Sequence, residues 1–144
     1  MEITRTFEVD ASRDALRAYL ADFSNAEQWD PGTVRCTPRT PGQPVQVGAQ
    51  WDNTSKLAGI ETDLVYELVT LADDHVVLRG ENESATAEDD LHLRDLGGGR
   101  TELTYHATIT FKGIKKIADP AAKLLFTKVA DEVVENLTRE GARL

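Results

Sequence analysis

The chain has 144 residues and a formal net charge of −9, with 25 Asp and Glu residues against 16 Lys and Arg residues. This length is typical of one domain with one hydrophobic core, so we expect residues 1–144 to form a single domain. The acidic balance argues against nucleic acid and anionic membrane surfaces as partners, because both bind basic protein faces.

The sequence also bears on cellular location and on cysteine chemistry. Cys36 is the one cysteine, which excludes an intrachain disulfide and a cysteine-based zinc site, and we expect its thiol to be buried. The N-terminus lacks a secretory signal pattern, and no stretch reaches the roughly 18 apolar residues of a membrane span. We therefore expect a cytoplasmic protein without membrane insertion. The sequence does not fix the oligomeric state, although a monomer is favoured.

The first quarter of the chain predicts a strand and one or two short helices. Residues 3–9 alternate between apolar and polar side chains, as in a strand covered on one face. Ser12 is a candidate N-cap for a helix whose apolar positions recur with a helical period, and Asp30-Pro31-Gly32 ends the helical region. Three later prolines confine any strand around Cys36 to a sheet edge.

Residues 47–111 predict a succession of strands, and a long helix follows. Four turn signals divide the strands: Ala58-Gly59, Ala72-Asp73-Asp74, Asn82-Glu83-Ser84 and Gly97-Gly98-Gly99. Asp119-Pro120 then provides an N-cap and a proline for the first helical position. The helix runs to about Arg143, and its apolar stripe comprises Ala122, Leu125, Phe126, Val129, Val133 and Leu137.

Hairpin geometry assigns the strand residues to two faces, because directly opposed residues lie on the same side of a sheet. The predicted pairs are Ala49 with Leu68, Trp51 with Tyr66, Asn53 with Leu64, Tyr66 with Gly80, Leu68 with Leu78, Thr70 with Val76, Ala87 with Ile109, Asp89 with Ala107, Leu91 with Tyr105 and Leu93 with Leu103. The middle hairpin assumes a three-residue turn, because a two-residue turn would place Arg79 and Glu81 on the apolar side. One face is then apolar and the other polar, and the long helix is the only predicted element large enough to cover the apolar face. Small residues on that face, such as Gly80 and Ala107, leave room for a gap.

Two polar residues fall on the predicted apolar face. An unpaired carboxylate at Asp89 would be costly there, so either a bulge turns it outward or it has a polar role in a pocket. Asn53 is a weaker case, with Glu132 and Asn136 of the helix as possible partners.

The histidines give no functional prediction. His106 lies opposite Asp90 on the polar face, where a solvated ion pair is favoured over an acid–base dyad. His92 is expected to lie among threonines and an arginine rather than beside further ligands, and His75 next to a turn carries no signal. We therefore expect no metal site.

Four stretches of the sequence carry a family resemblance: "FEVDASRDALRAYLADFSNAEQWDPG", "YELVTLADDHVVLRG", "LHLRDLGGGRTELTYHATITFKG" and the closing helix. Together they resemble the START/Bet v 1-like (SRPBCC) superfamily, within it the small bacterial domains of the polyketide cyclase/dehydrase and lipid-transport type. The resemblance implies an α+β helix-grip fold, with two short helices after the first strand and a bent antiparallel sheet of about seven strands around a long C-terminal helix. It also implies an elongated apolar cavity between sheet and helix, with the turn around "QWDPG" near the rim. None of these stretches is a catalytic signature.

The predicted cavity residues come from the turn, the apolar face and the helix. They are Trp29, Trp51, Asn53, Leu64, Tyr66, Leu78, Asp89, Leu91, Tyr105, Ala107, Ile109, Leu125, Phe126, Val129 and Val133. Trp29 is either a gate that touches ligand or a plug that packs the short helix onto the sheet. Trp51 and Tyr66 are either contacts for a ring-bearing ligand or an ordinary cross-strand aromatic pair.

Three functions remain open on this basis. The first is binding or transport of a small hydrophobic molecule, such as a lipid, polyketide or aromatic metabolite, without a cofactor. The second is a cyclase or dehydratase that uses the same cavity, with Asp89 or a tyrosine hydroxyl moving a proton, although that face lacks a nucleophile–base pair. The third is a protein-interaction module that acts through its acidic face, which includes the run "ENESATAEDD".

Overall fold

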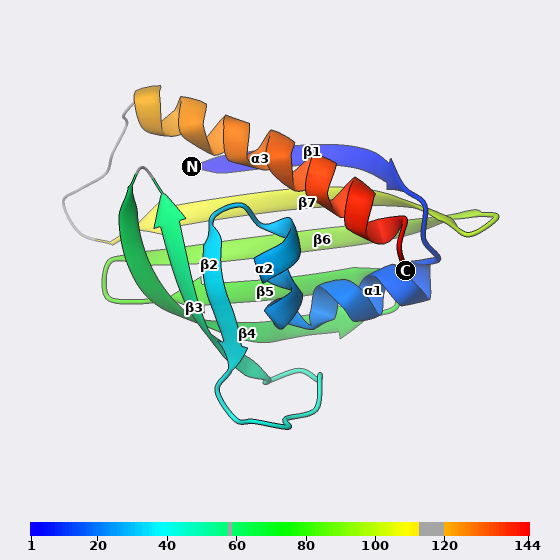
Figure 1. The fold of residues 1–144 in the computed structure, drawn as a ribbon, viewed down its shortest axis with the longest axis horizontal. Coiled ribbons are helices and arrows are strands. Elements are labelled where there is room, and N and C mark those ends of the chain that lie inside the picture. The colour runs from blue at the N-terminus through cyan, green and yellow to red at the C-terminus, as the bar shows by residue number, and fades with distance from the viewer. Residues whose placement is uncertain (58, 113–119) are drawn as a thin grey trace.

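The computed structural model describes residues 1–57, 59–112 and 120–144. The elements are β1 (Glu2–Val9), α1 (Arg13–Ala21), the 3₁₀ helix η1 (Phe23–Asn25), α2 (Ala26–Trp29), β2 (Thr33–Pro38), β3 (Gln50–Leu57), β4 (Ile60–Ala72), β5 (His75–Glu81), β6 (Ala85–Gly97), β7 (Arg100–Phe111) and α3 (Pro120–Gly141). The strands form one antiparallel seven-stranded sheet in the order β1-β7-β6-β5-β4-β3-β2. All helices lie on one side of this sheet, and α3 crosses it diagonally (Figure 1). The predicted helix-grip fold is confirmed.

Short polar side chains define the helical segment after β1. Ser12 accepts a hydrogen bond from the Ala15 amide at 3.2 Å and caps α1, as predicted. Asp22 caps η1 in the same way, accepting from the Ser24 amide at 3.1 Å. α2 ends at Trp29, and Asp30 then folds the chain back by accepting from the Gly32 amide at 2.9 Å. The predicted break at residues 30–32 is confirmed.

The predicted edge position of the second strand is also confirmed. β2 is the last strand of the sheet and pairs only with β3 among the described strands. Pro38 is the last residue of β2. Proline has no backbone N–H, and this is tolerated on an edge strand because there is no second neighbouring strand to bond with. Cys36 on this strand is a buried free thiol, and burial raises its pKa to about 12.

The β4–β5 hairpin differs from the prediction in its turn. Ala72 pairs with His75 across a two-residue turn, and Thr70 pairs with Val77 rather than with Val76. A β-bulge between Leu68 and Thr70 compensates for the shorter turn. Leu68 therefore still faces Leu78, and Tyr66 faces Gly80, as predicted. The bulge keeps Arg79 and Glu81 on the polar face despite the two-residue turn.

The last hairpin has the same combination of a shorter turn and an irregularity. Gly97 pairs with Arg100 across Gly98 and Gly99, and the register shifts between Asp95 and Gly97. All three glycines have positive φ, between 64° and 78°, a conformation that other residues rarely adopt. Beyond the shift the predicted pairs hold, including Asp89 with Ala107 and Leu91 with Tyr105.

The helix-covered face of the sheet is shared among several helices. α3 packs against β1 and α2, whereas α1 packs on β5, β6 and β7. The expectation that the long helix alone covers the apolar face was therefore wrong: the short helices after β1 cover a large part of it (Figure 1). At the end of α3, Gly141 lies so close to Val9 that any side chain there would overlap it. The predicted N-cap, Asp119, lies outside the described residues.

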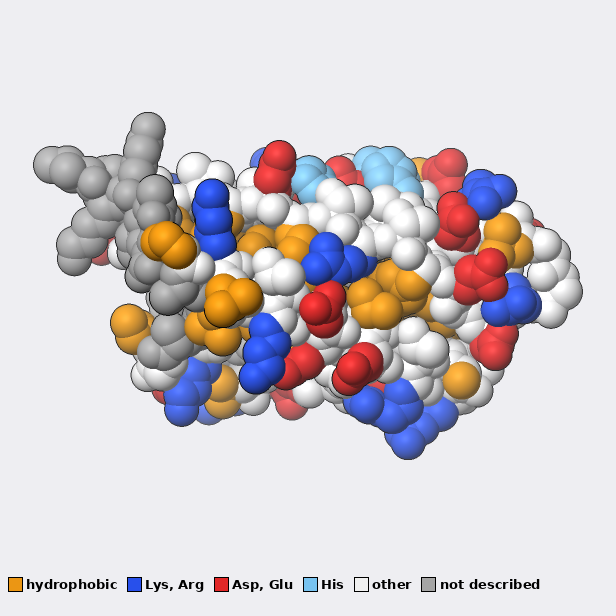
Figure 2. All heavy atoms as spheres, turned by 90° about the horizontal axis from the view of Figure 1, so that it is seen from above, with side chains coloured by type: hydrophobic (Ala, Val, Ile, Leu, Met, Phe, Trp, Pro, Cys, Tyr) orange, Lys and Arg blue, Asp and Glu red, His pale blue; other side chains and the backbone are white. Residues whose placement is uncertain are grey.

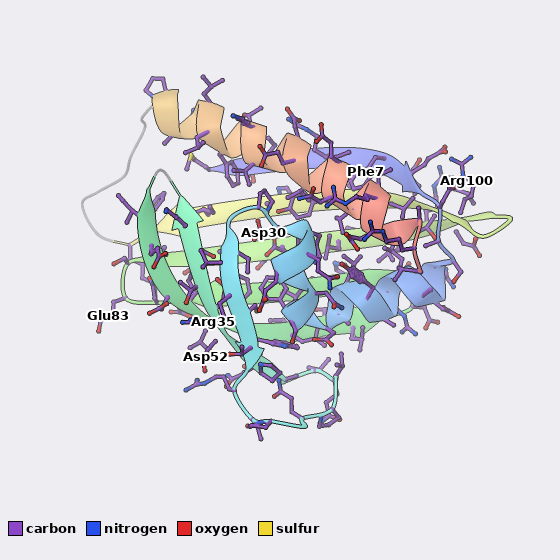
Figure 3. The ribbon with its side chains drawn as sticks, viewed as in Figure 1. Phe7, Asp30, Arg35, Asp52, Glu83 and Arg100 are labelled. Atoms are coloured by element: carbon purple, nitrogen blue, oxygen red, sulfur yellow. The ribbon has the colours of Figure 1, made fainter. Side chains whose placement is uncertain are left out.

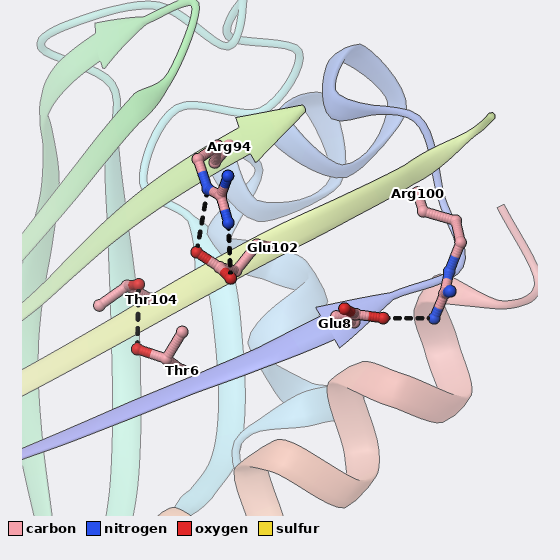
Figure 4. Close-up of polar contacts among 6 residues, drawn as sticks. All are labelled: Thr6, Glu8, Arg94, Arg100, Glu102 and Thr104. Atoms are coloured by element: carbon pink, nitrogen blue, oxygen red, sulfur yellow. Dashed lines mark hydrogen bonds and ion pairs between the residues drawn. The ribbon is translucent and has the colours of Figure 1, made fainter. Parts of the chain in front are cut away.

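The outer face of the sheet carries polar pairs between neighbouring strands. Arg94 on β6 donates two hydrogen bonds to the Glu102 carboxylate on β7, at 3.1 and 3.0 Å (Figure 4). Thr6 and Thr104 share a hydrogen bond of 3.1 Å between their hydroxyl groups, and Arg100 pairs with Glu8 at 2.6 Å (Figure 4). Exposed pairs of this kind contribute at most about 1 kcal/mol each, so they specify the register more than they stabilise the fold.

Among the described residues, no helix is long and apolar enough to cross a membrane.

Candidate functional site

The strand residues of the predicted cavity share the helix-covered face of the sheet. One row of paired residues runs across five strands on this face: Trp51, Tyr66, Gly80, Ala87 and Ile109. The neighbouring positions Asn53, Leu64, Leu78, Leu91, Tyr105 and Ala107 are buried on the same side. The structure therefore brings these side chains together as the register predicted. Their contact with a ligand stays a prediction.

Asp89 lies in the middle of this apolar face. The residue is 8% exposed, and it is opposed by Leu78 on β5 and by Ala107 on β7, with an unbroken register around it. The predicted burial is confirmed, and the alternative of a bulge at this position was wrong. The Tyr105 hydroxyl donates a hydrogen bond of 3.0 Å to Asp89 Oδ1. Burial, followed by the nearby Asp30 carboxylate, raises the pKa of Asp89 to about 7.

Asp30 is a second carboxyl group near the site, and it was expected only as a turn residue. It is partly buried at the end of α2 (Figure 3) and accepts hydrogen bonds from the Gly32 amide and, at 2.8 Å, from the Thr33 hydroxyl. Burial raises its pKa, although these two hydrogen bonds lower it. The position of Asp30 directly after Trp29, a predicted rim residue, is the signal that could have identified it.

Two tyrosines contribute hydroxyl groups to the same face. Burial, followed by the charge of Asp89, raises the pKa of both Tyr66 and Tyr105 well above the usual value for tyrosine. Both hydroxyl groups therefore remain protonated and able to donate hydrogen bonds at physiological pH. The Tyr66 ring lies over Gly80, where a Cβ atom would overlap it. The gap predicted at Gly80 is therefore filled by Tyr66.

The two tryptophans are packed into an aromatic cluster. Trp29 is completely buried, with ring centroids 6.0 Å from Phe23 and 6.2 Å from Tyr105 in edge-to-face geometry. Its indole N–H is buried and has no acceptor among the described residues. The indole N–H of Trp51 instead donates to the Ser24 hydroxyl at 3.2 Å. In this structure Trp29 therefore packs as a plug.

Asn53 has partners other than those expected from the helix. Its side chain donates to the Thr33 hydroxyl at 3.3 Å and accepts from the Ser55 hydroxyl at 2.6 Å. Asn136 of α3 instead donates to the Trp29 carbonyl at 3.1 Å. The predicted pairing of Asn53 with Glu132 or Asn136 was wrong, because β2 supplies a closer hydroxyl group.

The burial of α3 changes along its length. Phe126 is buried and Val133 and Leu137 are completely buried, whereas Leu125 and Val129 in the first half are only partly buried. Ala87 and Ile109, the paired residues on β6 and β7, are also partly buried and pack against the core. Apolar side chains in the first half of α3 and at these two strand positions thus remain partly accessible.

A separate depression of about 410 Å³ lies beside the β3 and β4 strands. Its lining is mostly polar: Arg35, Asp52, Asn53, Thr54, Asp63, Leu64, Val65, Glu81, Asn82 and Glu83. Figure 3 shows Arg35, Asp52 and Glu83 at the end of the sheet away from Arg100. Asn53 and Leu64 alone belong to the predicted cavity, so this depression is a different feature.

The histidines on the outer face have different partners from those expected. His106 lies 3.3 Å from Glu2 and not in contact with Asp90, although the two are opposed in the register. Asp90 instead contacts His75 at 2.7 Å and His92 at 3.2 Å. The expectation that His92 has no potential ligands beside it was therefore wrong, because the β5–β6 register places His75 directly opposite.

Comparisons with known proteins agree with this geometry. The solved structures with the same fold include a START superfamily protein from Mycobacterium smegmatis, with 17% identity, a TM-score of 0.80 and coverage of 99% of this chain and 97% of that one. An aromatase/cyclase from a Streptomyces species has 14% identity, a TM-score of 0.79 and coverage of 99% and 94%. The major latex-like protein 151 of Panax ginseng has 13% identity, a TM-score of 0.71 and coverage of 98% and 97%. The search of curated proteins finds no match.

The family assignment comes from the sequence itself. Residues 1–141 match the family described as polyketide cyclase / dehydrase and lipid transport. The family and the fold together support a role in binding a hydrophobic ligand or in chemistry of the polyketide cyclase type. Because the match spans nearly the whole chain, the protein belongs to the polyketide cyclase / dehydrase and lipid transport family.

Proposed function

We propose that the protein binds a small hydrophobic molecule between the helix-covered face of its sheet and α3, with Asp89 and Tyr105 as the polar anchor. The observation that carries this proposal is the buried Asp89–Tyr105 pair on an apolar face. A buried carboxyl group with one hydrogen-bond donor destabilises a fold relative to an apolar residue. A role in hydrogen bonding to a bound molecule would account for keeping such a group in the core.

The partly accessible apolar residues indicate where such a molecule would enter. Leu125 and Val129 in the first half of α3 are incompletely buried, and so are Ala87 and Ile109 on the helix-covered face of β6 and β7. Ligand sites are mostly apolar with a few convergent polar groups, and the helix-covered face combines these apolar residues with the Asp89–Tyr105 pair. A lipid, a polyketide or an aromatic metabolite is the class of molecule that fits.

Binding without turnover is favoured over catalysis by the residues on this face. The histidines lie on the opposite face, and the hydroxyl group that is hydrogen-bonded to Asp89 belongs to Tyr105, whose raised pKa keeps it protonated and disfavours its use as a nucleophile. Positioning alone is then the main contribution that the protein makes to its ligand.

A cyclase or dehydratase activity in the same place is the second candidate. The observation in its favour is the pKa of Asp89, which at about 7 allows the carboxyl group to take up or release a proton near neutral pH. The structural likeness to an aromatase/cyclase is compatible with this candidate. Turnover of a bound polyketide-type molecule, lost in Asp89→Asn with binding retained, would establish it.

Nile red binding tests the proposed site, because this neutral dye fluoresces strongly only in an apolar environment. Ala107→Trp should abolish dye binding, since the large side chain would fill the face beside Asp89. Thr110→Trp is the matched control, because Thr110 is an exposed residue of the same strand that pairs with Thr86 on the polar face. Undiminished binding to an Ala107→Trp variant with a native far-UV spectrum would overturn the proposed location.

A further inference from the structure

Three histidines lie on the outer, polar face of the sheet, away from the proposed ligand site. His75 is the first residue of β5, His92 lies on β6 and His106 on β7. Figure 2 shows histidine side chains gathered along one edge of that view, with acidic side chains beside them. None of these residues takes part in the function proposed above.

His75 and His92 form a paired cluster with one carboxylate. The two histidines are directly opposed across β5 and β6, and their rings stack with centroids 4.0 Å apart and planes 15° apart. Both Nε2 atoms point at the same oxygen of Asp90, at 2.7 Å from His75 and 3.2 Å from His92. Three potential ligand atoms, one from each residue, lie within 4.8 Å of one another.

From this geometry we infer that His75, Asp90 and His92 form a binding site for a divalent transition-metal ion such as zinc. Two imidazoles and one carboxylate are a donor set that suits zinc, copper or nickel rather than calcium or magnesium. Three protein ligands leave the remaining coordination position to water, as in zinc sites with an open position.

Two of the three separations between the ligand atoms are close to those of a zinc site. Zinc bonds of about 2.0–2.1 Å in tetrahedral geometry place neighbouring ligand atoms about 3.3 Å apart. The contact between His92 and Asp90, at 3.2 Å, already matches this separation, and the His75 contact of 2.7 Å must open by roughly half an ångström. The stacked rings must also rotate from parallel so that their nitrogen lone pairs converge.

The position of the cluster favours a preorganised site. β5 and β6 are interior strands of the sheet, so the backbone that carries all three residues is held from both sides. The Leu93 amide next to His92 also donates to the Asp74 carbonyl next to His75, at 2.9 Å. His75 and Asp90 are partly buried while His92 is exposed, which gives the ion a path from solvent.

Zinc titration of tag-free protein by isothermal calorimetry tests this inference. We expect one zinc ion per chain, with affinity lowered at least about tenfold by His92→Gln and by Asp90→Asn, since even changes around a metal ligand reduce affinity by such factors. His106→Gln is the matched control, because His106 lies on the same face but pairs with Glu2. The zinc affinity of His106→Gln should stay within about twofold of the parent's, a much smaller change than the loss expected when a metal ligand is removed.

The outcomes distinguish the metal site from a simple hydrogen-bonded cluster. Absence of saturable zinc binding by the parent would overturn the inference, as would a loss in His106→Gln equal to that in His92→Gln. Far-UV spectra confirm that each variant is folded. In a heteronuclear NMR titration, zinc should shift the ring signals of His75 and His92 and leave those of His106 in place. This result is independent of Nile red binding on the other face of the sheet.

Discussion

At the scale of single residues, the carboxyl group of Asp89 couples the fold to pH. Burial raises its pKa from 3.8 to about 7, so the folded protein holds this proton over a range in which the unfolded chain has released it. The unfolded state then binds fewer protons, and stability falls as pH rises from about 4 to about 7. Each pKa unit corresponds to about 1.4 kcal/mol, so the free energy of unfolding should fall by an amount on the order of 4 kcal/mol across this range because of Asp89.

Asp89→Asn should remove this dependence. The amide oxygen can still accept the hydrogen bond from Tyr105, but the side chain cannot ionise. In urea unfolding at a series of pH values, the variant should gain stability relative to the parent between pH about 4 and 7, and the difference should level off above pH about 7. A difference between the two proteins that is independent of pH would show that Asp89 titrates normally.

Gly80 provides a second prediction at this scale. A Cβ atom there would overlap the Tyr66 ring, so Gly80→Ala should displace the ring and destabilise the protein by about 1–3 kcal/mol. Urea unfolding measures the effect. In a Tyr66→Leu background the same substitution should cost less, because the overlapping ring is gone. Equal costs in both backgrounds would mean that the strain lies elsewhere.

The sequence predicts which face of the sheet a strand residue lies on, but it does not predict the partners of its side chain. The face of Asp89 follows from strand parity, which the two-residue turn at Gly98-Gly99 and the register shift beside it set as a three-residue turn would, so its place on the apolar face was predictable. The partners of Asp90 depend on side-chain rotamers and on the β5–β6 register, for which no pairing was predicted. Asn82 and Ala85 pair across a two-residue turn, and this register is what brings His75 opposite His92.

At the scale of elements, turn lengths were harder to predict than faces. Both the β4–β5 and the β6–β7 hairpins have two-residue turns together with a register shift, where a three-residue turn was expected. A bulge and a longer turn have the same effect on parity, so the hydrophobic pattern does not distinguish them. The existence of the long helix was predictable from its apolar stripe. The contribution of the short helices to covering the sheet was not, because it depends on how they pack.

The second half of α3 should contribute strongly to stability. Val133 is completely buried, so Val133→Ala should destabilise the protein by about 2 kcal/mol, with a smaller effect for the partly buried Val129→Ala. Leu124, which is 73% exposed on the same helix, provides the control, and Leu124→Ala should change stability by less than about 0.5 kcal/mol. Thermal or urea unfolding of the three variants makes the comparison. Similar losses for Val133→Ala and Leu124→Ala would contradict the observed orientation of the helix.

Across the whole chain, the two faces of the sheet differ in their chemistry. The helix-covered face is apolar and contains the Asp89–Tyr105 pair, whereas the outer face carries the ion pairs and the histidine cluster. This division explains how one acidic chain can combine an apolar, helix-covered face with a charged, hydrated surface. The resemblance read from the sequence predicted the architecture, and the family match and the topology confirm it.

Native mass spectrometry of the protein purified from its own host tests whether the helix-covered face holds a ligand. We expect the parent and Thr110→Trp to carry a small apolar molecule in a one-to-one complex, and Ala107→Trp, folded but with its site filled, to carry none. A bound molecule retained in Ala107→Trp, or a parent that carries none and takes up no hydrophobic ligand when one is supplied, would contradict a ligand site on the helix-covered face of the sheet.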